Sequence, residues 1–194
     1  MTCFSLNVVN YALILSKYYE EGSALLDLLL THSEMVARKA LTVAESAKLN
    51  IDRDFVYNAA MLHDIGIFRC NASGIHCYGD EPYIRHGLIG GELLRKEGVD
   101  EAFARVCERH TGSGLTAKEI AETGMPLPHI DLLPETLEEK LICYADKFFS
   151  KSGDPREEKS LDRVRKSMAK FGAESLARFD ALHAIFNSST NLTT

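Results

Sequence analysis

Apolar residues recur every three or four positions along most of this chain, which is the spacing of one helix face. The stretch 24–49 has the clearest stripe, made of Leu25, Leu28, Leu29, Val36, Ala40 and Val43. Runs that alternate apolar and polar residues, which would indicate strands, are missing. The pattern therefore predicts an all-α protein.

Capping residues and helix breakers set the expected boundaries of these helices. Asp52 is the expected N-cap of a helix that carries residues 63 and 64. Thr116 and Glu119 form a capping box, and Gly172 is expected to interrupt the last helical stretch. The expected helices span 5–19, 24–49, 53–64, 82–98, 100–110, 116–123 and 136–150, followed by a stretch from Asp154-Pro155 to 186.

These boundaries also give the expected domain organisation. We expect an N-terminal helix in residues 1–21, a central helical domain in 22–150, and C-terminal helices of 151–187 packed on that domain. The polar residues 188–194 are expected to be disordered. The stretch 67–81 is predicted to be a long loop, and loops of this length often carry function.

Composition narrows the classes of protein that remain. The chain has 194 residues and is 45% hydrophobic, which is enough for a sizeable core. A net charge of −6 argues against a broad electrostatic grip on a nucleic-acid polymer. No run of 18 apolar residues is present, so no membrane partner is expected. Five cysteines without a C-x-x-C pair, and an N-terminus without a basic start, predict a cytoplasmic protein with free thiols.

Candidate chemistry begins at Met61-Leu62-His63-Asp64-Ile65-Gly66. An imidazole and a carboxylate adjoin each other here on a helix face that is otherwise apolar. Burying such a pair is costly unless both groups are hydrogen-bonded, paired or bound to a metal. One pair of this kind is more often an ordinary buried polar pair, so its meaning depends on partners elsewhere in the chain.

Partners are present on four other predicted helices. His32, His86, His110 and Asp146 each replace an apolar residue on a core-facing surface. Six such groups in one helical domain predict two metal ions held between helices. Four imidazoles and two carboxylates suit divalent Fe, Mn, Co, Ni or Zn better than Ca or Mg.

The order of these residues resembles that of the HD-domain metal-dependent phosphohydrolases. His32, then His63-Asp64, then Asp146 follow the family's H…HD…D order, and residues 61–66 are similar to its HDIG form. His86 and His110 match the two further histidines of the binuclear members, which include the HD-GYP phosphodiesterases and a diadenosine tetraphosphatase branch. The resemblance covers about residues 22–150 and implies the fold of an HD-domain helical bundle with extra N- and C-terminal helices.

The resemblance also implies a ligand set. His32, His63, Asp64 and Asp146 would hold one metal, and Asp64 would bridge to a second metal held by His86 and His110. There are two departures from the family pattern. Ile67 stands where many relatives have lysine, and Thr111-Gly112-Ser113-Gly114 replaces the GYP signature after His110. The second departure argues against a cyclic-dinucleotide phosphodiesterase.

By the family's mechanism, a metal-bound hydroxide attacks phosphorus in a phosphomonoester or phosphodiester, with a nucleotide as the expected small substrate. Asp64 and Lys147 are the candidate catalytic residues. Positive or aromatic side chains near the proposed ligands are candidate substrate contacts, namely Arg69, Arg85, Arg109, His76 and Tyr78.

Two other functions stay open. Some HD-fold proteins use the same six ligands for a di-iron oxygenase, so the ligand set alone does not separate the two enzymes. A non-catalytic nucleotide or metal sensor is the third reading, and it has less support because no ligand of the pattern is missing. The expected partner is a small phosphorylated substrate, with a nucleotide as the expected class and a homodimer left open.

Overall fold

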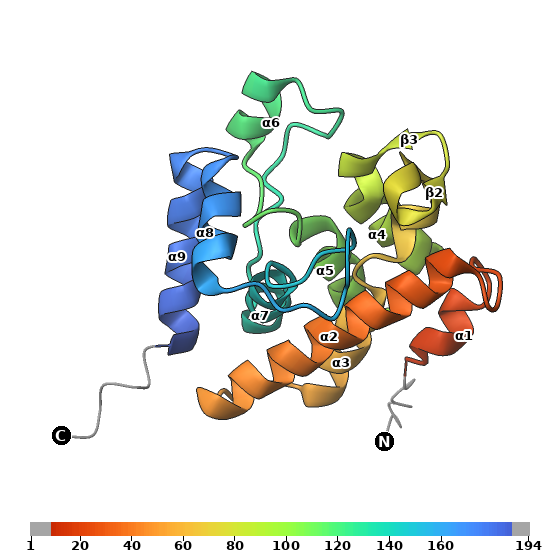
Figure 1. The fold of residues 1–194 in the computed structure, drawn as a ribbon, viewed down its shortest axis with the longest axis horizontal. Coiled ribbons are helices and arrows are strands. Elements are labelled where there is room, and N and C mark those ends of the chain that lie inside the picture. Colours follow the sequence, from red (N-terminus) through yellow and green to blue (C-terminus); the bar gives the residue numbers. More distant parts are fainter. Residues whose placement is uncertain (1–8, 188–194) are drawn as a thin grey trace, which may run out of the picture.

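The computed structural model describes residues 9–187 and is built almost entirely from helices (Figure 1). The all-α class predicted from the sequence is confirmed. The α-helices are α1 Tyr11–Leu15, α2 Ala24–Ser46, α3 Arg53–Leu62, α4 His86–Lys96, α5 Glu101–Arg109, α6 Ala117–Thr123, α7 Leu137–Asp146, α8 Leu161–Ala169 and α9 Ala173–Asn187. Three short 3-10 helices, η1 Ile65–Arg69, η2 Ser73–Ile75 and η3 Tyr83–Arg85, lie between α3 and α4.

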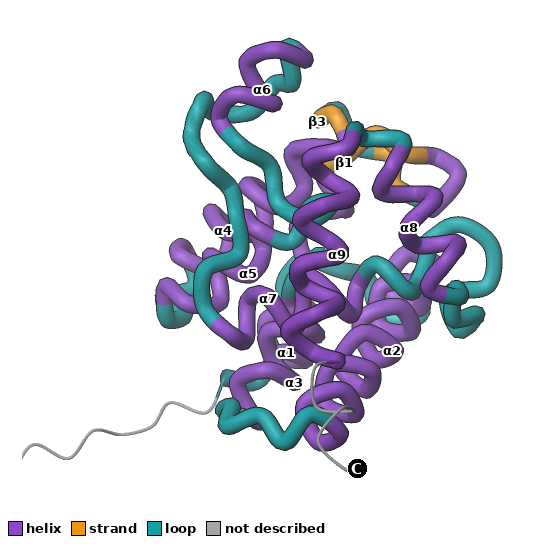
Figure 2. Tube along the Cα trace, turned by 90° about the vertical axis from the view of Figure 1, so that its left-hand side faces the viewer, coloured by secondary structure: helices purple, strands orange, loops and turns teal. Residues whose placement is uncertain are grey.

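Helix α7 is at the centre of the arrangement. It packs against α2, α3 and α5 on one side, and against α9 on the other. Figures 1 and 2 show the α8–α9 hairpin along one flank of the molecule and the α4–α5 pair on the opposite side of α7. The apolar core is continuous through these helices, with Leu29, Val36 and Ile142 fully buried. Residues far apart in the sequence therefore meet around α7.

Local capping chemistry places the starts of α3 and α6 where the sequence predicts them. The Asp52 carboxylate accepts the Phe55 amide at 2.9 Å at the start of α3. Thr116 and Glu119 form the predicted capping box of α6. Gly172 separates α8 from α9, as expected.

Several of the predicted helices are shorter than expected. The first, expected over 5–19, is only α1, because Asn10 caps it by accepting the amides of Ala12 and Leu13; residues 1–8 lie outside the described part. Helix α7 ends at Asp146 rather than at 150. The helix predicted from Asp154 begins only at Leu161, because residues 156–160 offer no apolar face to pack.

The predicted loop over 67–81 contains a small sheet instead. Strand β1 (Cys70–Ala72) pairs antiparallel with β2 (Cys77–Tyr78) and parallel with β3 (Glu81–Pro82). Strands of two or three residues are too short to show alternation in the sequence. Pro82 belongs to β3, so the next helix, α4, begins later than predicted, at His86.

Two glycines permit close contacts that the site depends on. A Cβ on Gly66, in η1, would lie 2.2 Å from the main-chain oxygen of His86. A Cβ on Gly87, in α4, would lie 2.4 Å from the main-chain oxygen of Cys107 in α5. Both distances are far below contact distance, so only glycine lets η1 approach α4 and α4 approach α5 this closely.

Two sequence predictions concern the cysteines and the ends of the chain. Cys70, Cys77, Cys107 and Cys143 are buried and free, as expected for reduced thiols. The tail of 188–194 falls outside the described residues, so its predicted disorder stays a prediction. Among the helices described, none has the length and apolar character needed to cross a membrane.

Candidate metal centre

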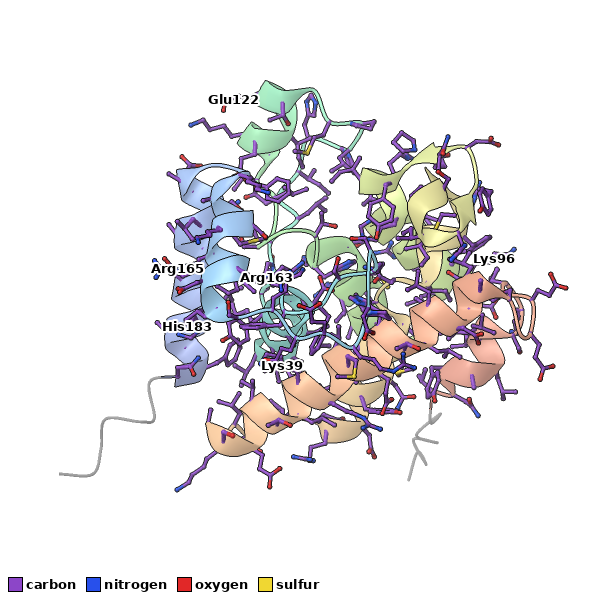
Figure 3. The ribbon with its side chains drawn as sticks, viewed as in Figure 1. Lys39, Lys96, Glu122, Arg163, Arg165 and His183 are labelled. Atoms are coloured by element: carbon purple, nitrogen blue, oxygen red, sulfur yellow. The ribbon has the colours of Figure 1, made fainter. Side chains whose placement is uncertain are left out.

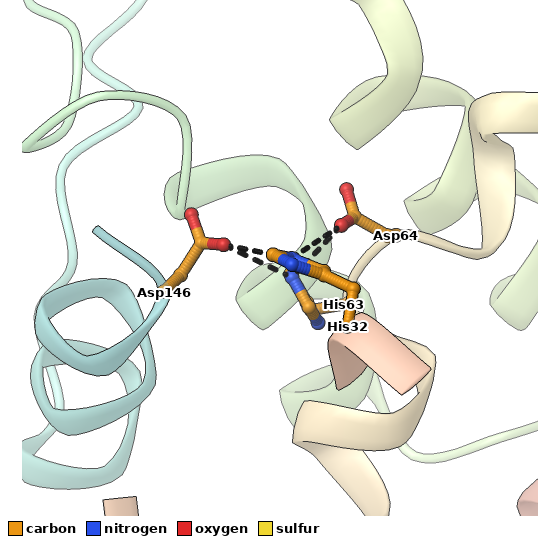
Figure 4. Close-up of side chains that lie close together, drawn as sticks. All are labelled: His32, His63, Asp64 and Asp146. Carbon is orange, nitrogen blue, oxygen red and sulfur yellow. Dashed lines mark hydrogen bonds and ion pairs between the residues drawn. The ribbon is translucent and has the colours of Figure 1, made fainter. Parts of the chain in front are cut away.

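A first cluster joins residues from three helices. His32 lies within α2, His63 caps the C-terminal end of α3, Asp64 follows it, and Asp146 ends α7. The His32 Nε2 atom is 3.0 Å from Asp146 Oδ1 and 3.3 Å from Asp64 Oδ2. The His63 Nε2 atom is 3.0 Å from Asp64 Oδ2 and 3.6 Å from Asp146 Oδ1. Both rings therefore lie between the two carboxylates (Figure 4).

A second cluster shares Asp64. Its other oxygen, Oδ1, is 3.3 Å from His86 Nε2 and 3.4 Å from His110 Nε2. The two Nε2 atoms are 3.0 Å apart. The structure thus brings together all six residues singled out in the sequence, with one oxygen of Asp64 facing each cluster.

Main-chain carbonyls fix the orientation of three of the four rings. The Nδ1–H groups of His63, His86 and His110 donate to the carbonyls of Ala60, Tyr83 and Cys107, at 2.6, 2.6 and 2.7 Å. A carbonyl can only accept a hydrogen bond, so Nδ1 carries the proton. When the ring is neutral, its Nε2 then presents a lone pair to the cluster, as metal-bound histidines do.

The residues fit divalent transition metals. Two ligand atoms about 2.1 Å from one ion, at the angles of tetrahedral or octahedral coordination, are roughly 3.0–3.4 Å apart. The separations above lie in this range, except for the 3.6 Å between His63 Nε2 and Asp146 Oδ1. His63 and Asp64 are fully buried, and within residues 9–187 His63 Nε2 and both Asp64 oxygens make no hydrogen bond of good geometry, although imidazole and ammonium groups lie close to the carboxylate. Buried polar atoms of this kind need a partner, and a cation would supply it.

The pKa values differ between the two clusters. Burial lowers the pKa of His86 to about 3 and also lowers that of His110, so both rings are neutral at pH 7. Burial acts in the same direction on His63, but the charges of Asp64 and Asp146 outweigh it and raise its pKa to about 9. The pKa of Asp64 is well below its usual range, because His63 and Lys151 outweigh the opposing effect of burial.

The HD domain family matches residues 29–150, a stretch that contains all six of these side chains. The chain belongs to the HD-domain family. This confirms the resemblance that the motif order indicated.

Several known proteins are similar to this HD-domain chain. Two are tRNA (cytidine(56)-2'-O)-methyltransferases. The one from Picrophilus torridus is 36% identical over 64% of this chain and 32% of its own length; the one from Thermoplasma volcanium is 32% identical over 82% and 42%. The chain therefore spans about a third to two fifths of these relatives.

Two further similarities come from other organisms. An uncharacterized protein of Methanocaldococcus jannaschii is 38% identical over 59% of this chain and 66% of its own. The crystal structure of the HD domain of the Listeria monocytogenes phosphodiesterase PgpH aligns with a TM-score of 0.48 at 15% identity, over 91% of this chain and 98% of that one.

A cavity of about 530 Å³ opens beside Asp146, where the HD domain meets the C-terminal helices. Three lysines, Lys147, Lys151 and Lys159, line it together with apolar residues that include Ile75, Met168 and Phe171. The predicted catalytic residue Lys147 donates to the His110 carbonyl at 2.8 Å and lies 2.5 Å from Asp146 Oδ2. It therefore contacts both clusters through their ligands.

Sequence analysis did not single out Lys151. Its Nζ atom is 2.5 Å from Asp64 Oδ2, and its side chain is only 12% exposed. Burial acts to lower its pKa, but the charge of Asp64 outweighs burial and raises it. Lys151 follows α7 in an irregular segment, so no helical periodicity could have related it to the ligands.

The five candidate substrate contacts lie elsewhere: in the described chain, none of them lines this cavity. Arg85 pairs with Glu81 at 2.9 Å, and Arg109 pairs with Glu135 at 2.7 Å. The other three, Arg69, His76 and Tyr78, are exposed in the segment between α3 and α4.

Proposed function

We propose that this protein is a metal-dependent phosphohydrolase acting on a small phosphate ester, with nucleotides as the expected class. The observation that carries the proposal is the shared carboxylate. Asp64 turns Oδ2 to His32 and His63 and Oδ1 to His86 and His110. Two adjacent ions joined by one carboxylate are a common arrangement for displacement at phosphorus.

In this proposal His32, His63, Asp64 and Asp146 hold one divalent ion, and Asp64, His86 and His110 hold the other. When bound, such a pair withdraws charge from phosphoryl oxygens and lowers the pKa of water. The protein's own contribution is to fix the geometry. The carbonyls of Ala60, Tyr83 and Cys107 hold the rings in place, and Lys147 bonds to Asp146 and to the His110 carbonyl.

The cavity supports a small substrate. Its volume of about 530 Å³ is typical of small-molecule sites. Lysines near Asp146 provide local positive charge although the whole chain carries −6. Ile75, Met168 and Phe171 offer apolar surface for the remainder of the ester. A polymer would instead require a broad positive surface.

The names of two relatives point to another reaction, the methylation of a tRNA cytidine. Those names describe whole proteins, of which this chain matches 32% and 42%. Methyl transfer to a ribose hydroxyl does not change any phosphate group. The two clusters of metal ligands would therefore have no role in that reaction. Phosphorylated RNA ends nevertheless belong in a substrate screen, because the relatives are named for tRNA.

The test is a screen for phosphate release. Metal-free protein is reloaded separately with Mn, Fe, Co, Ni or Zn and incubated with nucleotides, cyclic nucleotides and phosphorylated RNA ends. We expect release with at least one metal, and loss of release in His63→Ala with the helical circular dichroism signal preserved. Oxygen uptake by the iron-loaded protein without phosphate release would overturn the proposal in favour of an oxygenase.

A further inference from the structure

Three lysines line the cavity, and two of them are held by the main chain. The Lys147 ammonium donates to the His110 carbonyl at 2.8 Å and pairs with Asp146. The Lys159 ammonium donates to the carbonyls of Phe149, at 3.0 Å, and of Lys147, at 3.4 Å. These bonds close the end of α7 and the turn that follows it. Both ammonium groups therefore have structural partners that the arrival of a ligand does not remove.

Lys151 has a different environment. Its ammonium lies 2.5 Å from Asp64 Oδ2 and interacts with the hydroxyl of Tyr83. Within residues 9–187, no main-chain carbonyl is recorded as accepting a hydrogen bond from it. Tyr83 lines the same cavity, and its ring stacks on His86 with centroids 4.7 Å apart. The carboxylate of Asp64 is thus the main charged partner of Lys151.

That carboxylate has a second use in the proposed function. The oxygen that Lys151 contacts, Oδ2, is also 3.0 Å from His63 Nε2 and 3.3 Å from His32 Nε2. A divalent ion held by this cluster would take Oδ2 as a ligand and repel the ammonium. Lys151 would then need another anion, and its side chain already lines the cavity. A phosphate oxygen placed there would supply that negative charge.

We propose that Lys151 is the phosphate-binding cation of this cavity, whereas Lys147 and Lys159 maintain the structure around it. This inference rests on the proposed function, because it assigns a residue to the ester's phosphoryl group. Lys151 follows directly after the family-matched region of 29–150. Its segment joins α7 to α8 and crosses the middle of the molecule in the view of Figure 1. The part of the chain beyond the family match therefore completes the substrate site.

The experiment measures binding of inorganic phosphate to metal-loaded protein by isothermal titration calorimetry, with metal content from elemental analysis. Lys151→Gln is expected to weaken phosphate binding about tenfold or more, the usual effect of losing a hydrogen bond from a charged donor. Its metal content is expected to equal that of the wild type. Lys151→Arg is expected to retain most of the affinity, because it keeps the charge.

Lys170→Gln is the matched control. Lys170 is exposed at the end of α8 and does not line the cavity, and its substitution changes the net charge by the same amount. We expect wild-type phosphate affinity for this variant. If phosphate affinity falls equally in Lys151→Gln and Lys170→Gln, the loss is explained by net charge alone, and the inference is overturned.

Two further outcomes separate this inference from the proposed function. The inference fails if Lys151→Gln binds phosphate as the wild type does, or if this variant loses its metal. The proposed function survives either outcome as long as the wild-type protein releases phosphate from an ester. If the wild-type protein neither binds phosphate nor releases it from any ester, both the inference and the proposed function fail.

Discussion

The two clusters of the metal centre share Asp64 but differ in charge and in construction. The first also contains the carboxylate of Asp146, and its ligands come from α2, α3 and α7. The second adds only His86 and His110, which come from the adjacent helices α4 and α5. In the proposed centre a dication would meet two carboxylates in the first cluster and only the shared one in the second.

Because of this difference, we expect the two clusters to bind metal with different affinities. Carboxylates attract a dication more strongly than neutral imidazoles do, so the first cluster should fill first and hold its ion more tightly. The second cluster depends on Asp64 and on the close packing of η1 and α4 around Gly66. Damage to the second should therefore leave the first in place, whereas loss of Asp64 should disable both.

The largest effect is expected from Asp64→Asn. The substitution removes the shared charge, so metal content should fall from two ions per chain to almost none. Phosphate release should fall about a thousandfold, since charge stabilisation at the reacting group is lost.

Elemental analysis and a phosphate assay measure these changes. Asp54→Asn, an exposed position near the start of helix α3, is the control and should behave as wild type. Retention of two ions by Asp64→Asn would contradict the shared-ligand account.

His86→Gln should affect only one cluster. We expect one bound ion per chain, since His32, His63, Asp64 and Asp146 remain. His110→Gln should give the same stoichiometry. Titration of metal-free protein with Mn or Zn, followed by calorimetry, counts the sites. Complete loss of metal in either variant would show that the two clusters cannot be separated.

Gly66→Ala tests the packing that supports the second cluster. Its Cβ would lie 2.2 Å from the His86 carbonyl oxygen, so η1 and α4 must move apart. We expect a loss of about 1–3 kcal/mol in unfolding free energy, measured with urea, as for other overpacked sites. The second ion should be lost more readily than the first. Gly74→Ala is the control, because a Cβ there meets nothing within 4 Å. Unchanged stability and metal content in Gly66→Ala would refute this role.

The last prediction concerns the pH dependence of stability in the metal-free protein. The pKa of His63 is raised to about 9, so its contribution is complete below its unfolded pKa of about 6.5 and is lost as pH rises through 9. The pKa of His86 is lowered to about 3, so its contribution is present above pH 6.5 and is lost as pH falls toward 3.

Urea unfolding measured across this pH range would separate the acid side of the stability curve from its alkaline side. Stability should decrease on both sides of about pH 6.5. His63→Gln should flatten the alkaline side, and His86→Gln should flatten the acid side. If the two variants change the same side, the clusters do not differ in protonation as described.

The sequence predicted those parts of the molecule that depend on local chemistry. Asp52 and Thr116 mark helix starts because an N-cap needs only its own next three residues. The six clustered residues could be recognised because each interrupts an apolar face with a group that is costly to bury. The family's motif order then related positions that periodicity alone could not bring together.

Long-range pairings were beyond sequence reasoning. Arg109 was a substrate candidate, but Glu135, far along the chain, pairs with it. Lys151 depends on the path of the irregular segment after α7. Lys39 of α2, which is labelled in Figure 3, contacts that segment. Its ammonium pairs with Glu158 at 2.6 Å and lies over the Phe148 ring. No pattern in the sequence specifies such a path.

The most direct test of the shared metal centre is a crystal structure of the metal-loaded protein with anomalous diffraction data. We predict two anomalous peaks per chain. One should lie among His32, His63, Asp64 and Asp146, and the other among Asp64, His86 and His110, with one oxygen of Asp64 bound to each ion. A single peak, or two peaks of which only one contacts Asp64, would contradict the account.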